Sequence, residues 1–488
     1  MEYILKNLEP KKCFHYFEEI SRIPRSSYEE QQIAQYVMDF AAERGLKSYM
    51  DAAYNVYVSK PATPGYENRK GVIIQAHMDM VCVKDPGVEH DFSKDPIDLI
   101  IDGDWVRANG TTLGADNGSG VAMMLALLDS DDIPHPAIQC LFTSAEEVGL
   151  VGASQLEADR FEGDYLINLD GGNISKLLTA SAGTATHIYT LDEEQQPLSA
   201  EGMTAIIIGI DGLTSGHSGG MIHKGCANSI KLMGDILSEI SAIADFRLCS
   251  FTGGVKMNAI SKEARAVIAC KAEDADKISA CIARVAGCMK KEFARTDPDL
   301  IIISGPDDVP ATAMSPAAQD KLIAFIDLLF DGAYMFYNDE KTMAKTSCNI
   351  GILESIDGKT VATCLMRSNS NFEMDQLIRK SKRISALLGI DHEVKDRSAA
   401  WEGDGTPLIL RVAELYEAEF GEKPAFTQAH GGVEIGTILG LAAAAGKTIH
   451  AVNFGATSEA VHTTKERLHI PGMQQGYAWL QHVLINLD

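Results

Sequence analysis

The sequence lacks the features that would mark a membrane protein, a nucleic-acid-binding protein or a zinc-finger protein. No stretch reaches the roughly 18 consecutive apolar residues of a membrane-spanning helix, so we expect no membrane partner. Lys and Arg number 43 against 68 Asp and Glu, a formal net charge of −25, and so acidic a chain argues against a nucleic-acid partner. The 10 cysteines contain no C-x-x-C pair, which disfavours a zinc finger.

The remaining composition favours a cytoplasmic protein of two domains. The opening segment MEYILKNLEPKKCFHYFEEI carries acidic residues and no long apolar run, unlike a signal peptide. Scattered cysteines in a chain of 488 residues are typical of reduced, mostly buried thiols rather than of a disulfide framework. A chain of this length also exceeds one ordinary hydrophobic core.

Strand and helix patterns alternate at both ends of the chain. In the first part, apolar runs predict strands at 71–77, 137–144 and 164–170, and periodic patterns predict helices at 26–45 and 117–132. After about residue 400, patterns predict helices at 407–421 and 471–487 and a strand at 447–455. Such alternation is typical of an α/β fold with helices on both faces of a sheet.

The middle of the chain has a different pattern that occurs twice. Residues 257–293 and 348–389 each predict strand, turn, strand, break and helix, with Asp357-Gly358 as the second turn. A predicted strand at 203–210 and a predicted helix at about 217–240 precede the first copy. We therefore predict an inserted α+β domain made of two ferredoxin-like β-α-β-β-α-β halves. The predicted boundaries are 1–183 and 400–488 for the α/β domain and 184–399 for the inserted domain.

Histidines and carboxylates gather where the predicted strands of the α/β domain end. In an open α/β sheet, sites form at the carboxyl ends of the strands. Each residue alone has an ordinary structural explanation: a strand-end His is more often structural, an Asp in a Gly-rich turn is commonly a cap, and an adjacent Glu pair is usually solvated. Their coincidence at strand ends favours a shared site. The set is His77, Asp79, Asp116, Glu146, Glu147, Asp170 and His462.

This donor set suits a catalytic metal centre. Nitrogen and oxygen ligands without cysteine favour catalytic zinc, manganese or cobalt over structural zinc. Two metal ions about 3.5–4 Å apart need a bridging carboxylate and further ligands for each ion. Adjacent Glu146 and Glu147 can divide two roles, because one can bind metal while the other stays free as a base. Asp79 has the reach to orient the imidazole of His77.

Five motifs carry a resemblance to a known family. HMDMV, GADNGSG, SAEEVGLVGA, INLDGG and VHTTKE follow one another in the order found in aminoacylhistidine dipeptidases (peptidase D, Xaa-His dipeptidases). These belong to the wider carnosinase and carboxypeptidase-type di-zinc exopeptidases. The opening LEPKKCFHYFEEISRIPRSS and the stretch DGLTSGHSGGMIHKGCAN extend the similarity over nearly the whole chain. The resemblance implies a mixed-sheet di-zinc exopeptidase catalytic domain with an inserted lid or dimerisation domain.

The resemblance also implies residue roles in a two-zinc site. Asp116 bridges the two ions, His77 and Asp170 complete one, and Glu147 and His462 complete the other. Glu146 is the general base and Asp79 orients His77.

Further roles are implied for the inserted domain and for the stretch QAHGGVEIG. His217 stabilises the oxyanion, and Arg367 binds the substrate carboxylate. His430 and Glu434 line the substrate pocket. Local explanations remain open: His217 can be a helix-start residue, and Arg367 can pair with an acidic neighbour.

These implications predict a cytoplasmic metallodipeptidase. It would hydrolyse unblocked dipeptides, including Xaa-His dipeptides such as carnosine, through attack by metal-bound hydroxide with Glu146 as the base. The implied cofactors are two Zn²⁺ ions, with Mn²⁺ or Co²⁺ as alternatives, and the implied partners are small peptides and a second copy in a homodimer. The alternatives are a tripeptidase, an N-acyl amino acid deacylase, or a non-catalytic metal-binding homologue.

Overall fold

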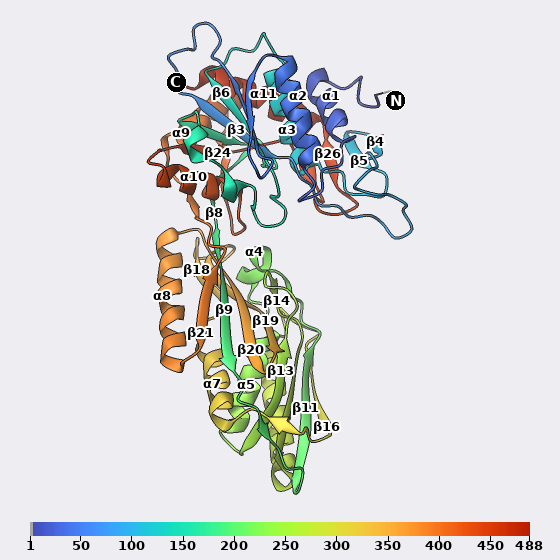
Figure 1. Cartoon of the computed structure of the whole chain (residues 1–488), viewed down its shortest axis with the longest axis vertical. Helices are drawn as coiled ribbons and strands as arrows, with labels where there is room; N and C mark the ends of the chain where they lie inside the picture. Colours follow the sequence, from blue (N-terminus) through green and yellow to red (C-terminus); the bar gives the residue numbers. More distant parts are fainter. Residues whose placement is uncertain (1–2) are drawn as a thin grey trace. The chain divides into compact units, whose positions relative to one another are not determined.

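The computed structural model describes residues 3–488. The chain divides into two compact units (Figure 1). Unit 1 comprises Met1–Ser181, Trp401–Gln428 and Gly432–Asp488. Unit 2 comprises Ala182–Ala400 and the short segment Ala429–Gly431. The sequence did not indicate that residues 429–431 belong to the inserted domain.

Unit 1 is built around one mixed sheet. Its strand order is β1, β2, β6, β3, β7, β24, β8 and β22, with β23 paired to β8. The strands are β1 (Lys47–Met50), β2 (Val56–Lys60), β3 (Val72–His77), β6 (Ile138–Thr143), β7 (Tyr165–Asn168), β8 (Lys176–Ser181), β22 (Trp401–Glu402), β23 (Ala425–Ala429) and β24 (His450–Asn453). The central strands β6, β3, β7 and β24 run parallel, so their carboxyl ends lie at one edge.

Helices and a small sheet complete unit 1. The helices are α1 (Lys11–Ile20), α2 (Gln31–Glu43), α3 (Ala115–Leu128), α9 (Pro407–Phe420), α10 (Glu434–Ala444) and α11 (Ile470–Asn486). The small sheet has the order β25 (Ser458–Glu459), β26 (Arg467–His469), β5 (Trp105–Ala108) and β4 (Leu99–Asp102). Every residue of β3 and β6 is buried, because one core joins these strands to the helices. This burial explains why the two strands are apolar runs rather than alternating ones.

Unit 2 is an antiparallel sheet packed against helices. The strand order is β16, β11, β15, β13, β19, β20, β9 and β21, with β18 paired to β19. The strands are β9 (Gly183–Asp192), β11 (Met203–Asp211), β13 (Phe246–Gly253), β15 (Ala264–Lys271), β16 (Ile301–Asp307), β18 (Gly332–Phe336), β19 (Ala344–Ile356), β20 (Lys359–Ser368) and β21 (Asp391–Lys395). The main helices are α5 (Ser229–Ser241), α6 (Ala275–Glu292), α7 (Pro316–Leu328) and α8 (Asn371–Leu388).

The sheet of unit 2 contains two ferredoxin-like halves. One half is β11-α5-β13-β15-α6-β16, and the other is β9-α7-β19-β20-α8-β21. In each half the strands lie in the spatial order fourth, first, third, second. The halves meet where Gly253 of β13 pairs with Leu353 of β19. The first half lies in the chain between β9 and α7 of the second, so the duplicated units are nested rather than sequential.

Two predictions for unit 2 were wrong in detail. The helix predicted at about 217–240 is interrupted: α4 (Ser218–Met221) and a short turn precede α5. Gly225 is left-handed, with a φ of 70°, and the Asn228 side chain accepts the N–H of Ile230 to start α5. Residues 257–260 supply only the two-residue β14 (Ala259–Ile260), because β15 pairs instead with β13.

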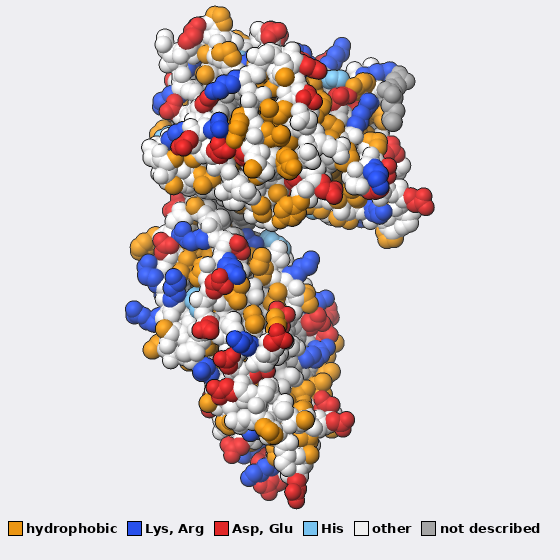
Figure 2. Space-filling model, in the orientation of Figure 1, with side chains coloured by type: hydrophobic (Ala, Val, Ile, Leu, Met, Phe, Trp, Pro, Cys, Tyr) orange, Lys and Arg blue, Asp and Glu red, His pale blue; other side chains and the backbone are white. Residues whose placement is uncertain are grey.

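The surface carries both charges. On the face drawn in Figure 2, the described Lys and Arg side chains are interspersed with Asp and Glu and form no broad basic patch. Among residues 3–488, no helix combines the length and the apolar composition needed for a membrane crossing.

Candidate metal centre

The parallel strands of unit 1 deliver most of the predicted ligands to one edge of the sheet. His77 is the last residue of β3, and the Glu146-Glu147 pair follows β6. Asp170 follows β7. Asp116 lies in the first turn of α3 but has non-helical φ and ψ, and His462 lies between β25 and β26 with a φ of 63°.

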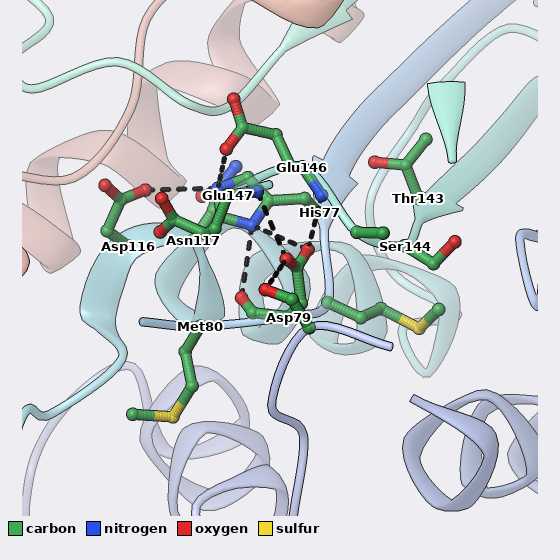
Figure 3. Close-up of polar contacts among 12 residues, drawn as sticks. His77, Asp79, Met80, Asp116, Asn117, Thr143, Ser144, Glu146 and Glu147 are labelled. Atoms are coloured by element: carbon green, nitrogen blue, oxygen red, sulfur yellow. Dashed lines mark hydrogen bonds and ion pairs between the residues drawn. The ribbon is translucent and has the colours of Figure 1, made fainter. Parts of the chain in front are cut away.

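The carboxylate of Asp116 lies between two imidazoles. Its Oδ1 is 3.2 Å from Nε2 of His77, and its Oδ2 is 3.3 Å from Nε2 of His462. Figure 3 shows the side chain of Asp116 directed at the His77 ring. Each oxygen of one carboxylate thus faces a different nitrogen, which is the arrangement that a bridging ligand requires.

Glu146 and Glu147 approach different histidines. The oxygens of Glu147 lie 2.9 and 3.0 Å from Nε2 of His462. Oε2 of Glu146 is 4.0 Å from Nε2 of His77. The two adjacent residues can therefore serve two different functions at one centre.

Asp79 lies on the other side of the His77 ring and is fully buried. Nδ1 of His77 is 3.1 Å from the carbonyl oxygen of Asp79 and 3.5 Å from its carboxylate (Figure 3). The same carboxylate accepts the backbone N–H groups of Glu146 and Glu147, at 3.0 and 3.2 Å. It also accepts the hydroxyl of Ser27 at 2.7 Å. Asp79 thus contacts both the imidazole of His77 and the backbone of the glutamate pair.

Burial, hydrogen bonds and neighbouring charges shift the pKa values of this cluster. Burial raises the pKa of Glu146 to about 8, and neighbouring carboxylates add to the rise against the opposing effect of His77. Burial and the nearby Asp116 carboxylate raise the pKa of Asp170. Hydrogen bonds to Asp116 and Glu147 raise the pKa of His462 to about 10. A cation at this place would offset the carboxylate repulsion that adds to the pKa rises of Glu146 and Asp170.

The residues fit metal ions in overlapping groups. Within the described residues, three groups have all ligand atoms within 4.8 Å of one another: His77 with Asp116 and Asp170, Asp116 with Glu147 and His462, and His77 with Glu146 and Glu147. The first two share Asp116, as expected of two neighbouring ions.

Comparison with known proteins identifies the family. The model of peptidase family M20/M25/M40 matches residues 73–486. The chain belongs to this family. The predicted peptidase class and exopeptidase fold are thereby confirmed.

Two relatives match this peptidase over nearly its whole length. The cytosol non-specific dipeptidase of Escherichia coli (strain K12) is 33% identical over 476 residues, which cover 97% of each chain. The crystal structure of the aminoacylhistidine dipeptidase of Vibrio alginolyticus has a TM-score of 0.89 at 32% identity, covering 99% of this chain and 98% of the other. The aminopeptidase PepT of Bacillus cereus, with a TM-score of 0.55 at 17% identity, shares the fold alone.

Two further predicted residues lie together in unit 2 of the peptidase. Nη2 of Arg367, on β20, is 3.5 Å from Nε2 of His217, which precedes α4. Nε of Arg367 donates to the hydroxyl of Ser218 at 3.3 Å. Burial lowers the pKa of Arg367 to about 10, and no described Asp or Glu forms an ion pair with it. The acidic neighbour that would give Arg367 a purely structural role is therefore missing from the described residues.

The two pocket residues from QAHGGVEIG fall in different units. His430 belongs to unit 2 and is buried, with Nε2 2.7 Å from the hydroxyl of Ser347 and Nδ1 3.2 Å from Oδ1 of Asn369. Glu434 belongs to unit 1 and is fully buried, accepting hydrogen bonds from Gln75 and Thr143. Substrate contact by these two side chains stays a prediction.

Sequence reasoning missed two buried charged residues next to the centre. Arg25 and Glu466 are each 2% exposed, and both contact the loop that carries Asp116. Each lies inside a stretch that carries the family resemblance, SRIPRSS and VHTTKE respectively. Their contacts, however, join segments far apart in the chain, and no local pattern specifies them.

Proposed function

We propose that this peptidase is a metal-dependent dipeptidase that hydrolyses unblocked dipeptides, Xaa-His dipeptides among them. The observation that carries the proposal is the Asp116 carboxylate, which presents one oxygen to His77 and the other to His462. The names of the two full-length relatives support the dipeptide class. The cytosolic relative also supports the cytoplasmic location that the sequence predicts.

The ligand set fits two divalent ions, with zinc preferred and Mn²⁺ or Co²⁺ as alternatives. Imidazole and carboxylate donors without thiolates are the set expected of a catalytic site for these metals. His77, Asp116 and Asp170 would hold one ion, and Asp116, Glu147 and His462 the other. When bound, such ions lower the pKa of a water molecule and polarise the carbonyl of the substrate.

Glu146 is proposed to be the group that transfers the proton of the attacking water. Its carboxylate lies at the centre without being needed in either of the two groups that share Asp116. Burial raises the pKa of this carboxyl in the metal-free protein, and nearby cations would lower it again so that the carboxylate can accept a proton. It can accept a proton from the attacking water and pass it to the leaving amine.

Arg367 and His217 are proposed to bind the substrate. A buried guanidinium without an ionic partner is matched by a carboxylate, which an unblocked dipeptide carries at its C-terminus. Burial and the nearby Arg367 cation lower the pKa of His217, so its ring is neutral at pH 7 and can donate one hydrogen bond to a developing oxyanion.

The same fold can also serve a tripeptidase or an N-acyl amino acid deacylase. The similarity to Peptidase T of Pasteurella multocida, 37% identity, spans only 18% of this chain, whereas the dipeptidase relative matches 97% of it. A homodimer stays a prediction from the family resemblance.

A substrate panel tests the proposal. Metal-stripped protein reloaded with zinc or manganese is assayed on Xaa-His and Xaa-Ala dipeptides, a tripeptide and an N-acyl amino acid. The proposal predicts hydrolysis of the dipeptides, including Xaa-His, and loss of activity in Asp116→Asn. The matched control Glu157→Gln, on the exposed surface, should keep wild-type turnover. Cleavage of only the N-acyl substrate, or full activity without metal, would overturn it.

A further inference from the structure

One buried carboxylate that is not a predicted ligand binds the loop that carries Asp116. Oε2 of Glu466 accepts the backbone N–H groups of Leu113 and Gly114, both at 2.9 Å. Oε1 accepts the backbone N–H of Asp116 itself, at 3.2 Å. Three donors of one loop are thus held by a side chain four residues beyond His462. Glu466 therefore connects the backbone of the bridging ligand to the segment that carries another ligand.

A buried cation holds the same loop through its carbonyl. Nη2 of Arg25 donates to the carbonyl oxygen of Gly114 at 2.6 Å, and Nη1 donates to that of Met78 at 3.0 Å. Met78 lies between His77 and Asp79. One guanidinium therefore spans the two segments that supply His77 and Asp116, as its planar fork allows.

The glycines of GADNGSG make room for this arginine. A Cβ atom at Gly114 would lie 2.4 Å from Nη2 of Arg25, and one at Gly118 would lie 2.8 Å from the same atom. Both distances are too short for real contacts, so side chains at these positions would displace the guanidinium. The motif thus combines a ligand, Asp116, with the space for the group that positions it.

The two charges are also complementary. Both residues are 2% exposed, and the Glu466 carboxylate is the strongest of the negative groups that stabilise the Arg25 cation. Neither residue belongs to the ligand groups found among the described residues. Gly114 is held by its N–H on one side and by its carbonyl on the other, so the loop has two independent anchors.

We propose that Arg25 and Glu466 are positioning residues that fix the bridging carboxylate Asp116 between His77 and His462, and so set the affinity for the paired metal ions. The inference rests on the proposed function, because it assumes metal ions at this centre. Residues that orient metal ligands typically change metal affinity or activity by about 10- to 100-fold when they are replaced.

Glu466→Gln is the direct test. The amide keeps the size of the side chain but replaces one acceptor with a donor, which opposes a backbone N–H of the loop. Glu459→Gln is the matched control, because Glu459 lies in the same hairpin and pairs with Arg467 at the surface. Zinc affinity and stoichiometry are measured by competition with a chromophoric chelator. The melting temperatures of the metal-free proteins are measured as well.

We expect zinc affinity about 10- to 100-fold weaker in Glu466→Gln and unchanged in Glu459→Gln, with activity partly restored by excess zinc. Arg25→Lys should show the same loss, because an ammonium lacks the fork that spans the Met78 and Gly114 carbonyls. If Glu466→Gln fails to fold, Glu466→Asp is tested instead. Asp retains the negative charge, but its side chain is one methylene shorter, so the carboxylate lies farther from the loop. Lower melting temperatures with zinc affinity within about threefold of wild type would show a structural role alone and overturn the inference. A wild-type protein that binds none of zinc, manganese and cobalt would instead refute the proposed function.

Discussion

Replacing Asp79 with Asn tests how the glutamate pair is held. One oxygen of Asp79 accepts the N–H of Glu146 at 3.0 Å, and the other accepts the N–H of Glu147 at 3.2 Å. An Asn side chain offers one acceptor and one donor, so either orientation turns its NH₂ group against one of these N–H groups. The hydroxyl of Ser27 can rotate to accept from the amide, but a backbone N–H cannot. At least one hydrogen bond to a charged group is lost in Asp79→Asn.

The size of the effect follows from that loss. A hydrogen bond to a charged group contributes about 1.5–3 kcal/mol, so the free energy of unfolding of the metal-free variant should fall by about this amount. Loss of the carboxylate beside Nδ1 of His77 should also weaken metal binding about 10- to 100-fold. Urea denaturation of metal-free protein and chelator competition measure the two effects. Asp39→Asn, on the exposed face of α2, is the matched control. An Asp79→Asn protein within about 0.5 kcal/mol of wild type and with wild-type metal affinity would refute this reasoning.

Three further predictions concern other parts of the site. Glu146→Gln should lower kcat about 10²- to 10⁴-fold while both metal ions still bind, and metal loss in this variant would contradict the role of a free base. Arg367→Met should raise KM for dipeptides more than it lowers kcat, and an unchanged KM would count against carboxylate binding. Hydrogen bonds to Asp116 and Glu147 raise the pKa of His462 to about 10, so the metal-free protein gains stability from this group that is fully present below about pH 6.5 and lost as the pH rises through about 10. Melting curves at these two pH values should differ less in His462→Gln, and an equal difference would contradict the assignment.

Much of the metal centre could be predicted because the parallel strands of the sheet place its ligands at one edge. His77, the glutamate pair and Asp170 follow apolar runs, and parallel strands bring their carboxyl ends to one edge. A local reading of strand ends therefore places these residues together without knowledge of long-range contacts. Asp116, in the first turn of α3, and His462, between β25 and β26, belonged to the same predicted set, and the resemblance to a family added the role expected of each.

Features that depend on distant segments could not be predicted. The partners of β15 are β11 and β13 rather than residues 257–260, because strand pairing is decided by packing in the sheet. The contact of Glu466 with Leu113 joins residues 353 positions apart, so no motif spacing encodes it. The nesting of one half of unit 2 inside the other is likewise a property of the sheet order.

The most direct test of the account is a metal titration of dipeptide hydrolysis. Metal-stripped protein receives zinc in small steps, and turnover of an unblocked Xaa-His dipeptide is measured at each metal-to-protein ratio. Because Asp116 presents one oxygen to each of two histidines, the account predicts negligible turnover without metal and a rise that ends at two zinc ions per chain. Full turnover in the stripped protein, or a rise that ends at one zinc ion, would contradict it.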